Sequence, residues 1–163
     1  MNYQRAVVTG VLPCAAVVLT VATRERRDAM TATAVFVSED PPLLSVSVAE
    51  HLLTHDLIEQ AGEFIVNLPA PAQVGMVRHL GSTHGRDVDK FEQFKLATEP
   101  SEKLAAPRVA GSYACLECKV VASHKAAVYR VYTAEVVAHT INENLGPLVW
   151  HQGRYFALGA PVT

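Results

Sequence analysis

Hydrophobic residues fall in short runs separated by turn-forming residues along most of the chain. The first run, Ala15 to Thr23, is rich in valine and leucine, which is typical of a buried β-strand. A charged turn, Arg24 to Asp28, follows it, and Thr31 to Ser38 reads as a second strand. These two segments therefore predict a β-hairpin near the start of the chain.

The next segment is a third strand whose start is marked by Asp40-Pro41-Pro42. Proline donates no ladder hydrogen bond and restricts the residue before it, so the second strand must end there. Strand residues alternate between faces, and the run Leu43 to Ala49 alternates accordingly. One face carries Leu44, Val46 and Val48, and the other carries Ser45 and Ser47.

Two short helices are predicted in the middle of the chain. Thr54 is a good N-cap for a helix that carries Leu57 and Ile58, and Gly62 stands where a glycine commonly ends a helix. The segment Glu63 to Leu68 returns to strand, and Pro71 to Leu80 has the apolar spacing of a second helix.

The second half of the chain is dominated by strand signals. The polar segment Gly81 to Asp89 predicts a loop; strands are then expected over Leu116 to Ser123, Val128 to His139, and Leu148 to Leu158 with a break at Gln152-Gly153. Many short strands with few helices favour a mainly β, α+β domain built on a β-barrel with short peripheral helices. A doubly wound parallel sheet would need regular strand–helix alternation. No linker or repeat divides residues 1–163, so a single domain is expected.

Composition narrows the function classes. Half of the 163 residues are hydrophobic, 18% are charged and the net charge is −2, which argues against disorder and against a nucleic-acid binder. Three cysteines cannot all pair, so a reducing cytoplasm is the expected location. Arg5 and the run Ala6 to Ala22 loosely imitate a signal peptide, but Gly10 and Pro13 interrupt the run, which is also too short for a membrane span.

A series of segments, in order, resembles the flavin reductase-like family, and its version is most similar to flavoredoxins. The segments are Met30-Thr31-Ala32-Thr33-Ala34, Val37 to Val48, Thr54, Gly62 to Pro69, Gly85 to Phe91, Leu116-Glu117-Cys118, Ala134-Glu135-Val136, and Gly153-Arg154-Tyr155 with Leu158-Gly159. Each segment alone is weak evidence, but their order over nearly the whole chain is specific.

The resemblance implies a split β-barrel that forms a homodimer and holds FMN, sometimes FAD, in a groove between the subunits. It also implies electron transfer from NADH or NADPH, or from a redox partner protein, through the flavin. The cofactor contacts that it carries over are Thr31, Ala32, Thr33, Ser47, Val48, Ala49, Thr54 and Lys90. This sequence departs from the family pattern at two positions. Tyr129 stands where relatives often carry a histidine linked to nicotinamide, and Ala134 replaces a glycine. An FMN-binding electron carrier without efficient NAD(P)H turnover therefore remains the alternative function.

The residue types at the expected cofactor site suit a flavin phosphate. A phosphate binds fixed N–H donors, short hydroxyls and a cation, and the start of the helix near Thr54 offers free N–H groups and a favourable dipole. Thr31 and Thr33 share one strand face. Lys90 is the candidate cation with Arg86 second, although a lysine in a loop is often merely solvated.

Other candidate chemistry is set aside. Cys115 and Cys118 are three residues apart, which on a strand places them about 10 Å apart on opposite faces, too far for a disulfide. The histidines lack a third ligand at a recognisable metal-binding spacing, so no metal site is expected. Trp150 is assigned to the core or a dimer interface. No catalytic acid or base is assigned, because the chemistry would belong to the flavin.

Overall fold

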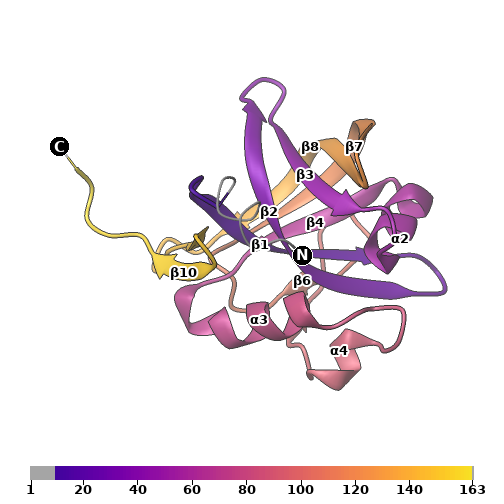
Figure 1. Cartoon of the computed structure of the whole chain (residues 1–163), viewed down its shortest axis with the longest axis horizontal. Helices are drawn as coiled ribbons and strands as arrows, with labels where there is room; N and C mark the ends of the chain where they lie inside the picture. The colour runs from indigo at the N-terminus through magenta and orange to yellow at the C-terminus, as the bar shows by residue number, and fades with distance from the viewer. Residues whose placement is uncertain (1–9, 163) are drawn as a thin grey trace.

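Six strands of the computed structural model, which describes residues 10–162, close into a β-barrel (Figure 1). The order around the barrel is β1–β2–β3–β8–β7–β4, and β4 also pairs with β1. The strands are β1 (Cys14–Ala22), β2 (Arg27–Ser38), β3 (Leu43–Ala49), β4 (Glu63–Leu68), β7 (Ala114–Ala126) and β8 (Tyr129–Ile141). Every pairing among them is antiparallel, which confirms the predicted mainly β barrel.

The remaining elements lie around this barrel. A hairpin of β9 (Leu148–His151) and β10 (Arg154–Ala157) extends the sheet from β1, and the expected break at Gln152-Gly153 is its turn. The other elements are α2 (Leu53–Ala61), the 3-10 helix η1 (Pro71–Gln73), α3 (Val74–Ser82), α4 (Lys90–Gln93), β5 (Thr98–Glu99) and β6 (Arg108–Val109). Within residues 10–162, no helix has both the length and the apolar character needed to cross a bilayer.

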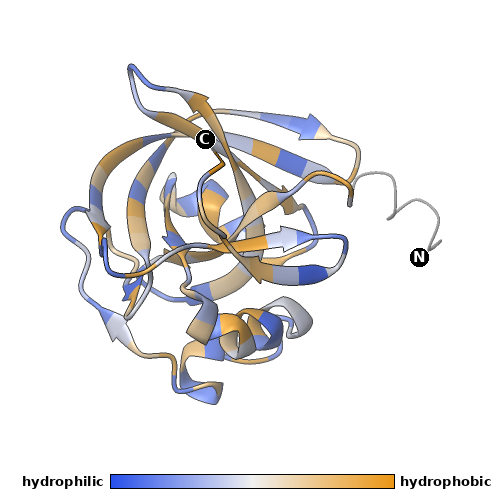
Figure 2. Ribbon diagram, turned by 90° about the vertical axis from the view of Figure 1, so that its left-hand side faces the viewer, coloured by the Kyte–Doolittle hydropathy of each residue, from blue (hydrophilic) through white to orange (hydrophobic). Residues whose placement is uncertain are grey.

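Strand β1 is apolar on both faces because both faces are covered. Val17, Leu19 and Val21 point into the barrel core, whereas Ala16 and Val18 pack with α3 in a second cluster outside it. On β3 buried Val46 and Val48 alternate with Ser45 and Ser47, and Figure 2 shows hydrophobic and hydrophilic stretches along the barrel strands. The barrel therefore has an outer face on β1 and β2 that is itself partly buried.

Helix α2 begins two residues earlier than its sequence signal indicated. Its N-cap is Leu52, which makes no side-chain capping hydrogen bond, so the prediction that Thr54 caps the helix is wrong. The Thr54 hydroxyl instead donates to Asp28 on β2. The end of the helix is as expected: Gly62 has φ 68°, and its N–H donates to the Ile58 carbonyl at 2.8 Å.

Cysteine chemistry plays no part in holding the fold together. Cys14, Cys115 and Cys118 are all free thiols. Cys118 lies in the barrel core, where burial raises the pKa of its thiol to about 12. A thiol that remains protonated is a poor nucleophile and a poor metal ligand, so Cys118 is a packing residue.

A buried carboxylate fixes the segment between β5 and β6. Glu117 on β7 is 1% exposed, and its oxygens accept hydrogen bonds from the backbone N–H groups of Glu102 and Lys103, both at 2.7 Å, and of Leu104 at 3.2 Å. Charge-assisted bonds of this kind are about twice as strong as neutral ones. Glu117 therefore anchors the loop that covers this side of the barrel.

Replacing Glu117 by glutamine is expected to lower the free energy of unfolding by about 1–3 kcal/mol, since one N–H donor loses its acceptor and the charge is removed. Urea denaturation of Glu117→Gln measures the change. Glu143→Gln, at an exposed turn position, is the matched control and should leave the midpoint unchanged. Equal midpoints for the two variants would show that Glu117 does not anchor the loop.

Candidate functional site

A cavity of about 660 Å³ lies on the outer face of the barrel over β1, β2 and β3. Its floor is made of outward-facing residues, because their strand neighbours Val17, Val46 and Val48 point into the core. The floor residues are Ala16, Thr31, Thr33, Ser47 and Ala49. All are small, so the floor leaves room for a ligand to approach the strands closely.

Aromatic side chains from distant parts of the sequence form the walls. Tyr129 lies directly opposite Ala49 in the β3–β8 ladder. Trp150 and Tyr155 come from the β9–β10 hairpin, in which they pair with each other. Trp150 also packs against the outer cluster, so it is both a packing residue, as expected, and part of the cavity.

A polar annex of about 100 Å³ continues from this cavity. The two spaces share Met30, Thr31 and Leu52 in their linings. The annex runs between the start of α2 and the segment 81–85, which includes two hydroxyl-bearing side chains, Ser82 and Thr83. The cavity and its annex thus form one elongated site with an aromatic end and a polar end.

A buried group of three residues stands behind the annex. Asp28 is 2% exposed, and its Oδ2 accepts a hydrogen bond from the Thr54 hydroxyl, with the two oxygens 2.5 Å apart. The Lys90 ammonium, 3% exposed, lies 3.2 Å from Asp28 Oδ1 and donates to the Ala29 carbonyl at 2.7 Å. Oδ1 makes no bond of good hydrogen-bond geometry, so its pairing with Lys90 is mainly electrostatic.

The same carboxylate explains why the residue at position 85 is a glycine. A Cβ on Gly85 would stand 2.3 Å from Asp28 Oδ1, which no side chain tolerates.

The interpretation of Lys90 as a solvated loop charge is wrong, because Lys90 is buried and paired with Asp28. The polar atoms of Thr54 and Lys90 are both engaged by this carboxylate. Sequence reasoning missed Asp28 because it follows a run of charged turn residues and resembles one more of them.

Arg86 lies outside the cavity and braces its edge. Its Nε donates to the His51 carbonyl at 3.0 Å, and its guanidinium pairs with Asp56 at 2.7 Å. The hydrogen bond from His55, together with Arg86 and against the effect of desolvation, lowers the pKa of Asp56 from its ordinary value. The brace matters because His51 and Leu52 both line the cavity.

The predicted site residues divide into three groups. Thr31, Ala32, Thr33, Ser47 and Ala49 line the cavity; Thr54 and Lys90 line the annex; and Val48 and Arg86 lie outside both. The Val48 side chain is in the barrel core, and the Ala32 methyl also packs toward that core. Cys14, His51 and Tyr155 line the cavity without having been predicted, because their place there depends on tertiary packing and not on local sequence.

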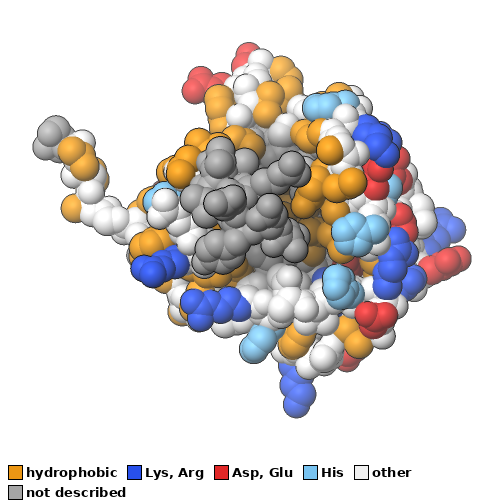
Figure 3. Space-filling view, viewed as in Figure 1, with side chains coloured by type: hydrophobic (Ala, Val, Ile, Leu, Met, Phe, Trp, Pro, Cys, Tyr) orange, Lys and Arg blue, Asp and Glu red, His pale blue; other side chains and the backbone are white. Residues whose placement is uncertain are grey.

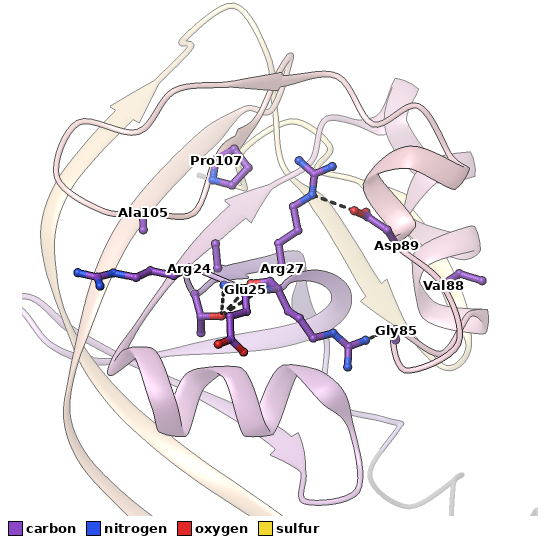
Figure 4. A pocket seen from close by; sticks show the side chains of 11 residues that line it. Arg24, Glu25, Arg27, Gly85, Val88, Asp89, Ala105 and Pro107 are labelled. Carbon is purple, nitrogen blue, oxygen red and sulfur yellow. Dashed lines mark hydrogen bonds and ion pairs between the residues drawn. The ribbon is translucent and has the colours of Figure 1, made fainter.

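A second cavity, of about 430 Å³, surrounds the β1–β2 turn but suits a flat ring poorly. It is lined by Arg24, Arg26 and Arg27 and by no aromatic residue. Figure 4 shows the Arg24 and Arg27 side chains pointing in different directions from this turn. Arg27 is already paired with Asp89 at 3.1 Å and Glu92 at 2.6 Å, so the guanidinium groups converge on no common ligand position.

Comparisons with known proteins agree with this architecture. The family described as "Flavin reductase like domain" matches residues 10–159. The reductase component of 4-hydroxyphenylacetate 3-monooxygenase from Thermus thermophilus is 30% identical over 140 residues, 84% of this chain and 83% of the relative. The NADH:FAD oxidoreductase of Streptomyces globisporus superimposes with a TM-score of 0.88 at 24% identity, covering 98% of this chain and 96% of that one.

The similarity also extends to flavoredoxin of Desulfovibrio vulgaris (Miyazaki F), with a TM-score of 0.84 at 22% identity over 93% of this chain and 90% of that one. With three further relatives the match is partial: the chain spans 64%, 37% and 60% of their lengths. At these identities the structural matches establish the shared barrel fold.

Replacing Asp28 by asparagine is expected to lower the free energy of unfolding by about 3–5 kcal/mol, because Lys90 would then be a buried charge without a counterion. Chemical denaturation measures the loss. The apolar pair Asp28→Leu with Lys90→Met should recover most of it, since both charges are removed together. Asp56→Asn, which breaks the half-exposed Arg86 pair, is the control and should cost less than about 1 kcal/mol. A small effect of Asp28→Asn would contradict this account of the cluster.

Proposed function

This chain belongs to the family of flavin reductase like domains, and we propose on that premise that it is a flavin-dependent oxidoreductase that binds FMN in the elongated cavity. The observation that carries the proposal is the continuity of an aromatic-walled slot over small strand residues with a polar annex beside a helix start. FMN is divided in the same way, because it consists of a flat ring and a tail that ends in a phosphate.

The small floor suits the ring. Over Ala16, Ser47 and Ala49 a planar group comes close to the strands, and Tyr129 and Trp150 offer apolar faces at its sides. The Thr33 and Ser47 hydroxyls supply hydrogen-bonding groups at the floor. Desolvation raises the pKa of Tyr155, so this cavity residue is a neutral hydrogen-bond donor around pH 7.

The annex suits the phosphate. The first turn of α2 has no side-chain cap, and Leu52, Leu53 and Thr54 at its start line the annex. Uncapped N–H groups at a helix N-terminus, with the helix dipole behind them, favour an anion. Thr54 and Lys90 act in this proposal by holding Asp28 and so positioning the helix start. Val48 contributes through the strand that bears Ser47 and Ala49, and Arg86 through the His51 turn.

When bound, the flavin would supply the redox chemistry, accepting a hydride from NADH or NADPH and passing electrons to an acceptor. The chain's own residues bind and orient the two rings and keep water from the slot. The names of the relatives, an NADH-dependent FAD reductase and monooxygenase reductase components, support a nicotinamide reductant. A structure of the Streptomyces oxidoreductase contains NAD and FAD fragments. The free state of all three cysteines supports a cytoplasmic location.

The rival function is an FMN-binding electron carrier that serves a redox partner protein. The fold shared with flavoredoxin and the tyrosine at position 129 favour it. The two functions differ in how fast nicotinamide reduces the bound flavin, because a carrier receives its electrons from another protein.

Anaerobic stopped-flow mixing of the FMN-loaded protein with NADH or NADPH tests the proposal. Rapid bleaching of the flavin absorbance is expected; slow or absent bleaching with intact FMN would establish the carrier function instead. Failure of the protein to bind FMN or FAD at all would refute both.

Filling the floor of the slot should abolish flavin binding. Ser47 is exposed on the outer strand face, so Ser47→Phe should leave the barrel folded while occupying the ring position. We expect FMN affinity, measured by fluorescence quenching, to fall more than about 100-fold, which is about 2.7 kcal/mol. Ser123→Phe, at an exposed position on β7, is the matched control and should bind FMN normally. Normal binding by Ser47→Phe would place the flavin elsewhere.

A homodimer forms part of the proposed function. Val35, Phe36 and Val37 on β2 are 63%, 70% and 46% exposed, an unusual density of apolar surface. They adjoin an apolar groove of about 400 Å³ that is lined by Val17, Leu44 and other barrel residues. A second copy of the chain, related by a twofold axis, is the partner that we propose for this surface, because isologous pairs are the commonest assembly.

Phe36→Lys should therefore shift the protein from dimer to monomer, because it places a charge in the proposed interface. Size-exclusion chromatography with light scattering measures the mass. Ile141→Lys also introduces lysine at an exposed aliphatic position, but at the last residue of β8, and should remain dimeric. A monomeric wild-type protein that holds FMN would refute the dimer while leaving the flavin site intact.

A further inference from the structure

Helix α3 is held directly against the wall of the cavity. The Thr31 hydroxyl, on the cavity floor, donates to the Val77 carbonyl. One turn later the helix comes still closer, because a Cβ on Gly81 would stand 3.3 Å from the Thr31 Cβ. The residue that follows Val77 on the helix contacts a wall residue of the cavity.

That residue is Arg78, and its guanidinium lies over an aromatic wall residue. The Arg78 Cζ is 5.8 Å from the centre of the Tyr155 ring. Cation–π contact at this distance orients a guanidinium without using its N–H donors. Arg78 is itself exposed, so those donors face solvent at the rim.

The charge of Arg78 is not neutralised by any carboxylate among residues 10–162. Arg86, at the other edge of the cavity, differs because it is paired with Asp56. Figure 3 shows basic side chains over α3 and β10 without acidic ones beside them, whereas basic and acidic side chains alternate toward α2. Within residues 10–162, the rim of the cavity thus carries a cation without a carboxylate partner beside Tyr155.

We propose that Arg78 binds the diphosphate of a dinucleotide whose ring end enters the cavity, and so determines which nucleotides the site accepts. This inference rests on the proposed flavin site. A planar guanidinium matches phosphate oxygens with paired N–H donors and remains charged at every physiological pH. In this proposal the annex binds the phosphate of FMN, so Arg78 binds a second phosphate group. Such a group is present in two molecules, the nicotinamide reductant and the adenylate end of FAD.

Binding measurements on Arg78→Ala separate these sources. We expect calorimetric titration of NAD⁺ into FMN-loaded protein to show about tenfold weaker binding than wild type, as for loss of one charge-assisted hydrogen bond. Under stopped flow, half-saturation should need about tenfold more NADH, with the limiting reduction rate unchanged. N-benzyl-dihydronicotinamide, which has no phosphate, should reduce both proteins equally. A weakened affinity for FAD, with NAD⁺ binding unchanged, would instead identify the flavin adenylate as the bound diphosphate.

Arg24→Ala is the matched control, because Arg24 is also an exposed arginine without a carboxylate partner in the described chain but lies at the β1–β2 turn. It should leave every binding constant unchanged. Arg78→Lys retains the charge and should recover part of the affinity, and the salt dependence of NAD⁺ binding should flatten only in Arg78→Ala.

The inference is overturned if Arg78→Ala binds NAD⁺ and FAD as wild type does. It is also overturned if the variant loses FMN affinity to the same degree, since Arg78 would then hold the flavin phosphate itself. Wild-type protein that fails to bind FMN contradicts the proposed function, whereas normal FMN binding with unchanged Arg78→Ala contradicts only this inference.

Discussion

The candidate site depends on one buried interaction, the contact of the Asp28 carboxylate with Lys90 and Thr54. These residues come from β2, the start of α4 and the first turn of α2, so a single carboxylate holds three elements at one point. Leaving a charge unpaired in such a place costs several kcal/mol, which makes this arrangement of the elements strongly preferred over its alternatives. Gly85 completes it by letting the loop pass over the carboxylate.

The barrel contributes the second constraint, the alternation of side chains on its strands. In β3 the apolar residues Val46 and Val48 fill the core, and therefore Ser47 and Ala49 must face outward. The same alternation turns Ala16 and Thr33 outward on the neighbouring strands, opposite each other in the β1–β2 ladder. A cavity with a floor of small residues is thus a by-product of packing the barrel, and the β9–β10 hairpin and α3 enclose it.

Electrostatics distinguish the two ends of that cavity. Toward α2, the Arg86 cation is paired with Asp56 and braces the His51 edge of the cavity without offering free charge. Toward β10, Arg78 lies over Tyr155 and has no carboxylate partner within residues 10–162. An anionic ligand therefore meets a paired arginine at one end of the cavity and an unpaired arginine at the other. This difference in charge favours one orientation of the bound ligand.

The sequence by itself determined the barrel strands and the β9–β10 hairpin, the positions of most turns, the family, and five of the residues that line the cavity, Thr31, Ala32, Thr33, Ser47 and Ala49. The strands and turns follow from local preferences and from a period of two, which a sequence displays directly, whereas the five site residues came from the family resemblance. The tertiary structure alone decided the partners of Thr54, Lys90 and Arg86, and it brought Cys14, Tyr129 and Tyr155 to one cavity. The reason is physical: whether a polar side chain meets a ligand or a buried counterion depends on segments distant in sequence, and Asp28 is separated from Lys90 by about sixty residues that carry no local sign of the pairing.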